Sequence, residues 1–357
     1  MIIVRYLTKQ VLQTTAALTF ILLIVVVLGR LLQYLAQASA GELDPGVLAL
    51  LMGYRIPDFL QLILPLALLL GTLLAYGRMY ADSEMTVLIA CGFSSARLLR
   101  ITLVPAVGIA LLVAFLALWL TPRGLVNTAT LMEAQKNLNE FDVMVPGLFQ
   151  NISGGARTTY AESITGTDMN QVFMYQAEGN RVIYAQSATP IEDENDGRFI
   201  LFRNGMLTEG QAGTDNFEMS SFGELGVRLP QRDLGFEVVL DEQAMESSAL
   251  LQSGESAQIA ELQWRLSLVL LIPVLALLAV PLSKVSPREG RFARLVPAII
   301  LYMLYFGLLL VARDKLAEGT LSPVLGLWWV HALFALLGWA LFSGRLPPLP
   351  VLRVRHA

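Results

Sequence analysis

The sequence has 357 residues, of which 55% are hydrophobic and 15% are charged, and its formal net charge is −4. Soluble globular proteins usually contain roughly 45–50% apolar and about 25% charged residues. The composition therefore excludes an ordinary soluble enzyme, and the small net charge gives no indication of nucleic-acid binding. The single cysteine, Cys91, cannot form a disulfide within the chain, so cysteine content does not indicate a compartment.

Six segments lack Asp, Glu, Lys and Arg and are long enough to be transmembrane helices. A helix needs about 20 mostly apolar residues to cross roughly 30 Å of hydrocarbon. These runs are continuous and lack the alternation of barrel strands, so they indicate helices. The six segments are 10–29, 59–77, 101–122, 266–283, 295–312 and 319–344.

The basic residues near the span ends predict the orientation. Six spans place both termini on one side, where the loops and ends carry 12 basic and 3 acidic residues, a net charge of +9. The opposite side holds the long segment 123–263, with 8 basic and 21 acidic residues. Because the cytoplasmic side carries the excess of Lys and Arg, we expect cytoplasmic termini and an external long segment.

The first span has an alternative interpretation as a cleaved signal sequence. Ala36-Gln37-Ala38 follows an apolar run and resembles a signal-peptidase site. The run is longer than the usual ~7–15 residues, however, and Arg30 interrupts it before the site. A retained first helix is therefore expected. Arg30 lies at its outer end, where it either extends to headgroups or binds a phosphate, and both readings stay open.

The loop at 78–100, between the second and third spans, is expected to contain a helix of about two turns. Asp82 or Ser83 suits the N-cap, Glu84 lies in the first turn, where the helix dipole favours an anion, and Gly92 suits the C′ position. The body of this helix is unusually apolar for a cytoplasmic loop and must be covered. Its own helices, the lipid interface and a groove on a partner protein are the alternatives.

The sequence pattern of the external segment changes at 146–230, where apolar and polar residues alternate in short runs. This pattern indicates about eight strands and an antiparallel sandwich or jelly roll. Asn204-Gly205 and Gly179-Asn180 are predicted hairpin turns, since both central positions of a type I′ turn need positive φ. This segment has no His or Cys and no pattern of metal ligands, nucleophile and base, or phosphate loop, which argues against catalysis. The runs lie at 157–163, 171–178, 181–188, 198–203 and 216–222.

Helical connectors are expected on either side of the strands, at 125–141 and 241–263. An exposed edge of the sheet either accepts a strand from another protein or is blocked by charge. Toward the end of the chain, the basic loop 283–294 is interpreted as an anchor to anionic headgroups. His331, inside the sixth span, is expected to be neutral and hydrogen-bonded to a neighbouring helix, and Asp58 to cap the second span.

The sequence contains no Gly-Lys-Ser or Gly-Lys-Thr and therefore lacks a Walker A loop. Any ATP-driven activity must use another chain. This chain is therefore not expected to bind ATP in the P-loop manner.

Four segments together closely resemble the LptF/LptG permeases of the bacterial lipopolysaccharide exporter, and the first favours the LptF branch. The resemblance covers the whole chain, including the position of the long insertion. The segments are Met-Ile-Ile-Val-Arg-Tyr-Leu at 1–7, Gln-Leu-Ile-Leu-Pro-Leu at 61–66, Ser-Glu-Met-Thr-Val-Leu-Ile-Ala-Cys-Gly at 83–92 and Val-Pro-Leu-Ser-Lys-Val-Ser-Pro-Arg-Glu-Gly-Arg at 280–291.

The resemblance implies a polytopic α-helical protein of the Gram-negative inner membrane, with six transmembrane helices and a periplasmic β-jellyroll domain inserted between helices three and four. Its domains would be 1–122, 123–263 and 264–357. Its implied partners are an LptG-like permease homologue, an LptB-like ATPase homodimer, an LptC-like single-span protein and an LptA-like periplasmic bridge. The resemblance implies that the ATPase binds ATP and magnesium and hydrolyses the ATP, while this chain has no cofactor and no enzymatic activity. Its substrate would be lipopolysaccharide, taken from the periplasmic leaflet and passed to the bridge.

The resemblance also implies site residues. The coupling helix of the family falls on 83–91, with Ser83, Glu84, Met85, Val87 and Leu88 toward the ATPase. The substrate entrance falls on Arg30. Gln33 is uncharged where relatives can carry a second basic residue, so the positive charge of this entrance is weaker or lies mainly on the partner.

Two other functions compete with ATP-driven lipopolysaccharide export. One is a non-transporting scaffold or signalling protein whose external domain is switched by a partner ATPase. The other is a secondary transporter, which scarce intramembrane carboxylates and the lack of an evident inverted repeat disfavour. An amphiphile-sized cavity open to the outer leaflet separates the exporter from a scaffold.

Overall fold

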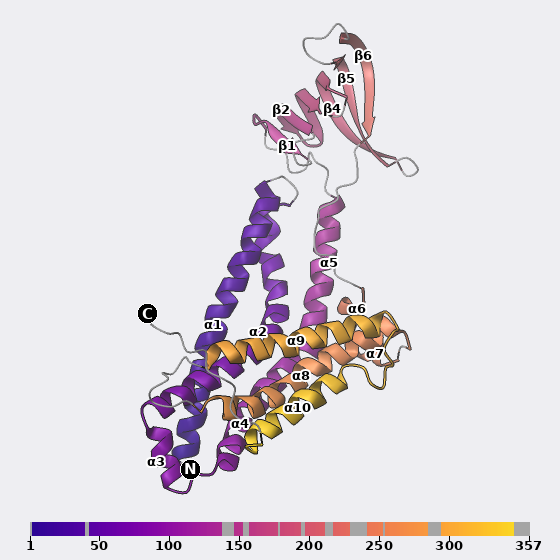
Figure 1. Ribbon diagram of the computed structural model, residues 1–357. Coiled ribbons are helices and arrows are strands. Elements are labelled where there is room, and N and C mark those ends of the chain that lie inside the picture. The colour runs from indigo at the N-terminus through magenta and orange to yellow at the C-terminus, as the bar shows by residue number, and fades with distance from the viewer. Residues whose placement is uncertain are drawn as a thin grey trace. The chain divides into compact units, whose positions relative to one another are not determined.

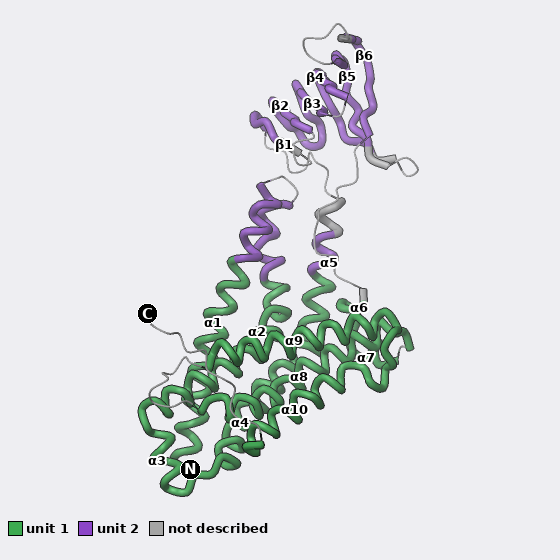
Figure 2. The backbone as a smooth tube through the Cα atoms, viewed as in Figure 1, with its two compact units in different colours: residues 1–28, 53–127, 239–357 green, residues 29–52, 128–238 purple. Residues whose placement is uncertain are grey.

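The computed structural model combines long helices with one antiparallel sheet inserted between them, which confirms the expected fold class (Figure 1). Two compact units divide the chain (Figure 2): one contains 1–28, 53–127 and 239–357, and the other contains 29–52 and 128–238. The structure describes residues 2–39, 43–137, 146–152, 157–177, 179–193, 197–210, 217–228, 241–252, 254–284 and 294–345.

Five of the described helical segments are long and apolar enough to cross a membrane. In the third of them, helix α4 continues through a π-helical turn, η2, into α5 without a break. In the second, a short 3₁₀ turn, η1 (Pro45–Val47), precedes α2. The helices are α1 (Ile2–Ser39), α2 (Leu48–Ala81), α4 (Ser95–Phe115) with η2 (Leu116–Leu120) and α5 (Thr121–Asn137), α8 (Ser256–Leu282) and α9 (Leu295–Ala317).

The sixth predicted span is shorter than expected. The charge-free window is 319–344, but the helix it contains, α10, covers only Trp328–Phe342, 15 residues. Pro323 and Gly326, which has a φ of +37°, interrupt the start of the window. The side chain of Gln263 holds this stretch, donating to the carbonyl of Pro323 at 2.7 Å and accepting from the amide of Leu327 at 3.0 Å.

Helix α8 forms the centre of the helical core. It packs against α4, α9 and α10, and most of its side chains between Ala260 and Leu282 are buried, although Leu266 and Leu270 are exposed. By contrast, α1 and α9 expose apolar side chains such as Phe20 (65%) and Met303 (67%). Prolines inside α2, α4 and α8 do not end these helices, as expected for segments whose neighbours satisfy the freed carbonyl groups.

Six described strands form one antiparallel sheet in sequence order, which is a meander. They bury nine hydrophobic residues in one cluster, among them Met174, Ile183 and Phe202. The all-β character of the insertion is thus confirmed, while the described strands form a single sheet rather than two packed ones. The strands are β1 (Gln150–Ile152), β2 (Arg157–Thr165), β3 (Asp168–Gln176), β4 (Arg181–Asp193), β5 (Gly197–Gly210) and β6 (Phe217–Arg228).

The hairpin predicted at Asn204-Gly205 is wrong. Both residues lie inside β5, where Gly205 pairs with Ala185 of β4 and with Phe222 of β6. A Cβ at Gly205 would lie 2.5 Å from the Phe222 ring, so this glycine makes room for a cross-strand aromatic ring rather than for a turn. The other predicted hairpin is confirmed, since Gly179 (φ +84°) and Asn180 (φ +45°) connect β3 to β4.

Helical connectors flank the sheet as predicted. On the first side, α5 runs to Asn137, and residues 138–145 lie outside the described part. On the second side, two short helices, α6 (Asp241–Ala244) and α7 (Ser247–Gln252), precede α8. Residues 285–293 of the predicted basic anchor also lie outside the described part.

Candidate functional site

The loop between α2 and α4 contains the predicted short helix, α3 (Glu84–Ala90). Ser83, one of the two predicted residues, is the N-cap, but it has a φ of 62° and its side chain makes no cap hydrogen bond. A left-handed serine is uncommon and turns the chain sharply out of α2. The predicted role of Gly92 is confirmed: its φ is +84°, and its amide and that of Phe93 donate to the carbonyls of Ile89 and Leu88, which is a Schellman motif.

The apolar residues of α3 divide into a buried side and an exposed side. Met85 is 1% exposed and belongs to the core of the helical unit. Val87 is 61% exposed and Ile89 is 50% exposed. Packing within the chain therefore covers only part of the apolar surface that the sequence predicts must be covered.

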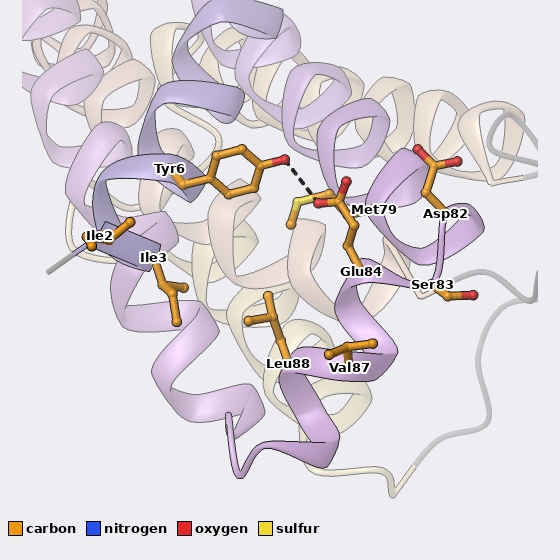
Figure 3. Close-up of a pocket in the computed structure, with 9 residues that line it drawn as sticks. All are labelled: Ile2, Ile3, Tyr6, Met79, Asp82, Ser83, Glu84, Val87 and Leu88. Atoms are coloured by element: carbon orange, nitrogen blue, oxygen red, sulfur yellow. Dashed lines mark hydrogen bonds between the residues drawn. The ribbon is translucent and has the colours of Figure 1, made fainter.

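The start of α1 lies beside α3 and forms a pocket of about 470 Å³ with it. Tyr6 of α1 donates a hydrogen bond from its hydroxyl to Glu84 Oε2 at 3.0 Å, while the side chains of Asp82 and Ser83 point away from Tyr6 (Figure 3). The pocket wall is mostly apolar, and Glu84 supplies a carboxylate within it. The residues that line it are Ile2, Ile3, Tyr6, Met79, Asp82, Ser83, Glu84, Val87 and Leu88.

Two contacts hold α1 against α2 and so support this pocket. Arg78 donates to Gln10 Oε1 at 2.8 Å, one turn beyond Tyr6. Further along, the backbone of Thr15 approaches Gly71 so closely that a Cβ there would lie 2.9 Å from the Thr15 Cα. Arg97, just after α3, places its guanidinium 5.5 Å from the centre of the Phe93 ring.

This arrangement is suited to binding another protein rather than to catalysis. It combines exposed aliphatic side chains with one positioned carboxylate, as helix-in-groove interfaces do. Within the described part of the chain, no group of three His, Cys, Asp or Glu residues is placed to hold a metal ion.

The predicted entrance residues belong to the other compact unit. Arg30 and Gln33 lie one turn apart on α1, and Arg30 donates to Gln33 Oε1 at 3.3 Å. Four of the predicted α3 residues, Ser83, Glu84, Val87 and Leu88, therefore line one pocket. Met85 does not face a partner as predicted, because it is buried in the core, and Arg30 and Gln33 lie together in the other compact unit.

Two polar residues of the spans have partners that refine their predicted roles. His331 Nδ1 lies 2.6 Å from the hydroxyl of Tyr305 on α9, which confirms a hydrogen bond to a neighbouring helix. Asp58 does not cap α2, because this helix begins ten residues earlier, at Leu48. Asp58 instead lies 3.6 Å from Arg55 and accepts a hydrogen bond from Gln61.

Tyr6, Ile2 and Ile3 are parts of the α3 site that were not predicted from the sequence. The structure begins α1 at residue 2, eight residues ahead of the charge-free window, and this early start brings these residues to α3. Their contact with Glu84 links positions 78 residues apart. Such a contact follows only from the packing of α1 on α2.

Comparison with known proteins agrees with this fold. The sequence matches the family model described as "Lipopolysaccharide export system permease LptF/LptG" over residues 5–344. It is 31% identical to the lipopolysaccharide export system permease protein LptF of Escherichia coli K12, over 99% of this chain and 98% of that protein. The protein of the same name from Shigella flexneri shows the same identity and coverage. The chain thus belongs to the LptF/LptG family of lipopolysaccharide export permeases.

Proposed function

We propose that the chain is a transmembrane subunit of an ABC transporter that extracts lipopolysaccharide from the periplasmic leaflet of the inner membrane. The observation that carries this proposal is the α3 site: Val87 and Ile89 are exposed beside Glu84, in an export permease whose sequence has no Walker A loop. Such a surface is suited to a partner that hydrolyses ATP. The chain itself then binds no cofactor, and ATP and magnesium belong to the ATPase.

In this mechanism the ATPase pushes on α3 when it closes around ATP. Met85 is buried in the core, and Arg78 and Tyr6 connect α2 and α3 to α1, so a force on α3 is transmitted to the first two spans. Narrowing of a cavity lined by these spans and α9 then expels the amphiphile toward a periplasmic β-jellyroll bridge.

The proposed assembly also requires a second permease and an LptC-like single-span protein. The exposed apolar faces of α1 and α9, including Phe20 and Met303, are available to lipid or to such helices. The charge distribution of the sequence supports cytoplasmic termini and a periplasmic sheet. Arg30, with Gln33, is positioned near the outer end of the first span to contact substrate phosphates.

The test of the coupling role is Glu84→Lys in the full chain, with co-purification of the LptB-like ATPase and lipopolysaccharide transfer as readouts. Charge reversal is expected to weaken ATPase association or to uncouple hydrolysis from transfer, while the membrane part stays folded. Glu318→Lys is a matched control, because Glu318 is an exposed carboxylate at the end of α9. Full transfer by a well-expressed Glu84→Lys variant would contradict the proposal.

The entrance is tested separately, with a photo-crosslinking residue at position 30 or 33 and the complex in its native membrane. Adducts with lipopolysaccharide are expected from position 30. If position 30 gives no adduct while neighbouring positions do, Arg30 is not part of the entrance. A scaffold or signalling protein would give no adduct anywhere and no ATP-dependent transfer.

A further inference from the structure

The start of α8 contains a buried arginine whose donors are all used. Arg265 is 2% exposed, and its Nε donates to Glu261 Oε1 at 2.9 Å. Its two terminal nitrogens donate four more hydrogen bonds, all to the connector that leads from the sheet back to α8. These acceptors are the carbonyl oxygens of Glu242, Gln243 and Met245 and the hydroxyl of Ser247, at 2.8–3.2 Å.

These acceptors lie where α6 ends and α7 begins, so Arg265 satisfies carbonyls that the short helix α6 leaves open. A guanidinium has five N–H donors in a fixed planar fork. The five atoms that accept hydrogen bonds from Arg265 lie either on α8 itself or on the returning connector. Arg265 thus fastens this connector to α8.

The same network reaches span three, the helix that continues into the connector on the other side of the sheet. Ser247 accepts from Arg265 and donates from its hydroxyl to the carbonyl of Leu118 at 2.8 Å. Leu118 lies in the π-helical turn η2, four residues before Pro122. Carbonyls of a π-helical turn accept from the amide five residues on, so the serine hydroxyl is an additional donor that connects Leu118 to the returning connector. Span three, which continues into α5, is therefore joined to the returning connector.

A second arginine closes the network. Arg313 of α9 donates to Glu261 Oε2 at 2.8 Å and lies over the Trp264 ring, 5.1 Å from its centre. Glu261 is 5% exposed and thus has one arginine on each carboxylate oxygen. Removing one partner from such a buried set leaves an uncompensated charge, so the set behaves as one unit.

We propose that Arg265 is a positioning residue that holds the returning connector, residues 241–252, against α8 and, through Ser247, against span three, so that a movement of α8 against span three reaches the sheet through this connector. Loss of this fastening leaves ATP hydrolysis intact and lowers the amount of lipopolysaccharide transferred per ATP. The inference rests on the proposed export function for its second part only, because the fastening is also measurable by itself.

The test uses Ser247→Ala and Arg265→Lys in the full chain, purified with its ATPase and reconstituted in lipid. Ser247→Ala removes the hydroxyl between Arg265 and Leu118, and Arg265→Lys keeps the charge beside Glu261 but cannot reach five acceptors. Ser247→Thr retains the hydroxyl and is the rescue variant. Ser248→Ala is the matched control, since Ser248 is exposed and its hydroxyl lies 3.5 Å from Glu246.

Hydrogen exchange of residues 241–252 measures the fastening, and transfer per ATP measures its consequence. We expect at least threefold faster exchange and at least threefold lower transfer per ATP in Ser247→Ala and Arg265→Lys, with normal hydrolysis, and wild-type values in Ser247→Thr and Ser248→Ala. Unchanged exchange in Ser247→Ala overturns the proposal whether or not Arg265→Lys folds. Parallel losses of hydrolysis and transfer also overturn it, because they indicate a general packing role.

Failure of the proposed function gives a different result. In that case the wild-type complex transfers no lipopolysaccharide, or the Glu84→Lys variant keeps full transfer. Hydrogen exchange of residues 241–252 still reports whether Arg265 and Ser247 hold the returning connector in place.

Discussion

The start of α8 and the short helix α3 both combine charge with apolar surface, but they differ in how far the chain itself completes them. At α8, Glu261 and Arg265 are buried and each finds its partners within the chain. At α3, Glu84 accepts a hydrogen bond from Tyr6, and Val87 and Ile89 remain exposed. The charged groups at the start of α8 are paired within the chain, whereas the α3 surface is one that a partner protein can cover.

This difference separates effects on folding from effects on binding. Buried charges that lose a partner destabilise the folded state, whereas exposed apolar residues contribute only when something covers them. Substitutions at α8 are therefore expected to change stability or transmission within the chain. Substitutions at the exposed side of α3 are expected to change association with the ATPase and little else.

The largest effect is expected from Glu261→Ala. It leaves Arg265 and Arg313 without their shared carboxylate, and breaking a buried ion pair in this way costs about 3–5 kcal/mol. Thermal unfolding of the purified chain in detergent measures the loss. Glu318→Ala is the control, because the Glu318–Lys315 pair is exposed and its loss should leave the unfolding temperature unchanged. If both variants lowered the unfolding temperature equally, the buried ion pairs of Glu261 would contribute no more to stability than the exposed Glu318–Lys315 pair.

Within α3, Met85→Ala and Val87→Ser are expected to act on different properties. Met85 is buried, so its truncation should lower the unfolding free energy by about 2–5 kcal/mol. Val87→Ser should leave unfolding unchanged and weaken ATPase binding roughly tenfold to a hundredfold, because covering a valine contributes about 1.5–3 kcal/mol. Titration of the ATPase against the reconstituted chain measures the affinity. A Val87→Ser variant with unchanged affinity shows that the exposed side of α3 is not the ATPase contact.

Gly71→Ala tests whether α1 belongs to the fixed part of the molecule. The added methyl group would meet the Thr15 backbone, so α1 must move away from α2, at a cost of about 1–3 kcal/mol. Gly53→Ala on the same helix meets no atom within 4 Å and is expected to stabilise α2 by roughly 0.5–1 kcal/mol. Opposite shifts of the unfolding temperature in the two variants are the expected result. Shifts of the same sign would show that α1 is not held closely at Thr15.

The smallest effect is expected from Tyr6→Phe. It removes one exposed hydrogen bond to Glu84 and keeps the ring in the pocket wall, so ATPase affinity should fall less than about fivefold, or under 1 kcal/mol. The same titration measures it. A loss as large as that of Glu84→Lys would mean that the orientation of the carboxylate, and not only its charge, determines binding.

The apolar helices, the inserted sheet and the end of α3 followed from the sequence because they depend on simple physical rules. Continuous charge-free segments identified five helices long enough to cross a membrane, and alternating runs identified the inserted sheet. The left-handed position at Gly92 followed from the end of α3. Each of these depends on local composition or backbone conformation.

The remaining features depend on contacts between distant residues. The window for the fourth span began at residue 266 because Arg265 is charged, yet α8 begins at Ser256, since Glu261 neutralises that arginine inside the helix. Asn204-Gly205 has the composition of a hairpin turn, but Phe222 of a neighbouring strand occupies the space beside Gly205. Tyr6 and Glu84 meet only because α1 packs on α2.

The short helix α10 has a consequence for the lipid around it. At 15 residues it is about 22 Å long, less than the roughly 30 Å of a typical hydrocarbon layer. Either the bilayer thins beside α10, or the non-helical stretch before it lies within the hydrocarbon. Gln263 makes the second arrangement possible, because it satisfies the carbonyl of Pro323 and the amide of Leu327 that water cannot reach there. Hydrophobic mismatch at this helix would make the activity of the permease sensitive to acyl-chain length.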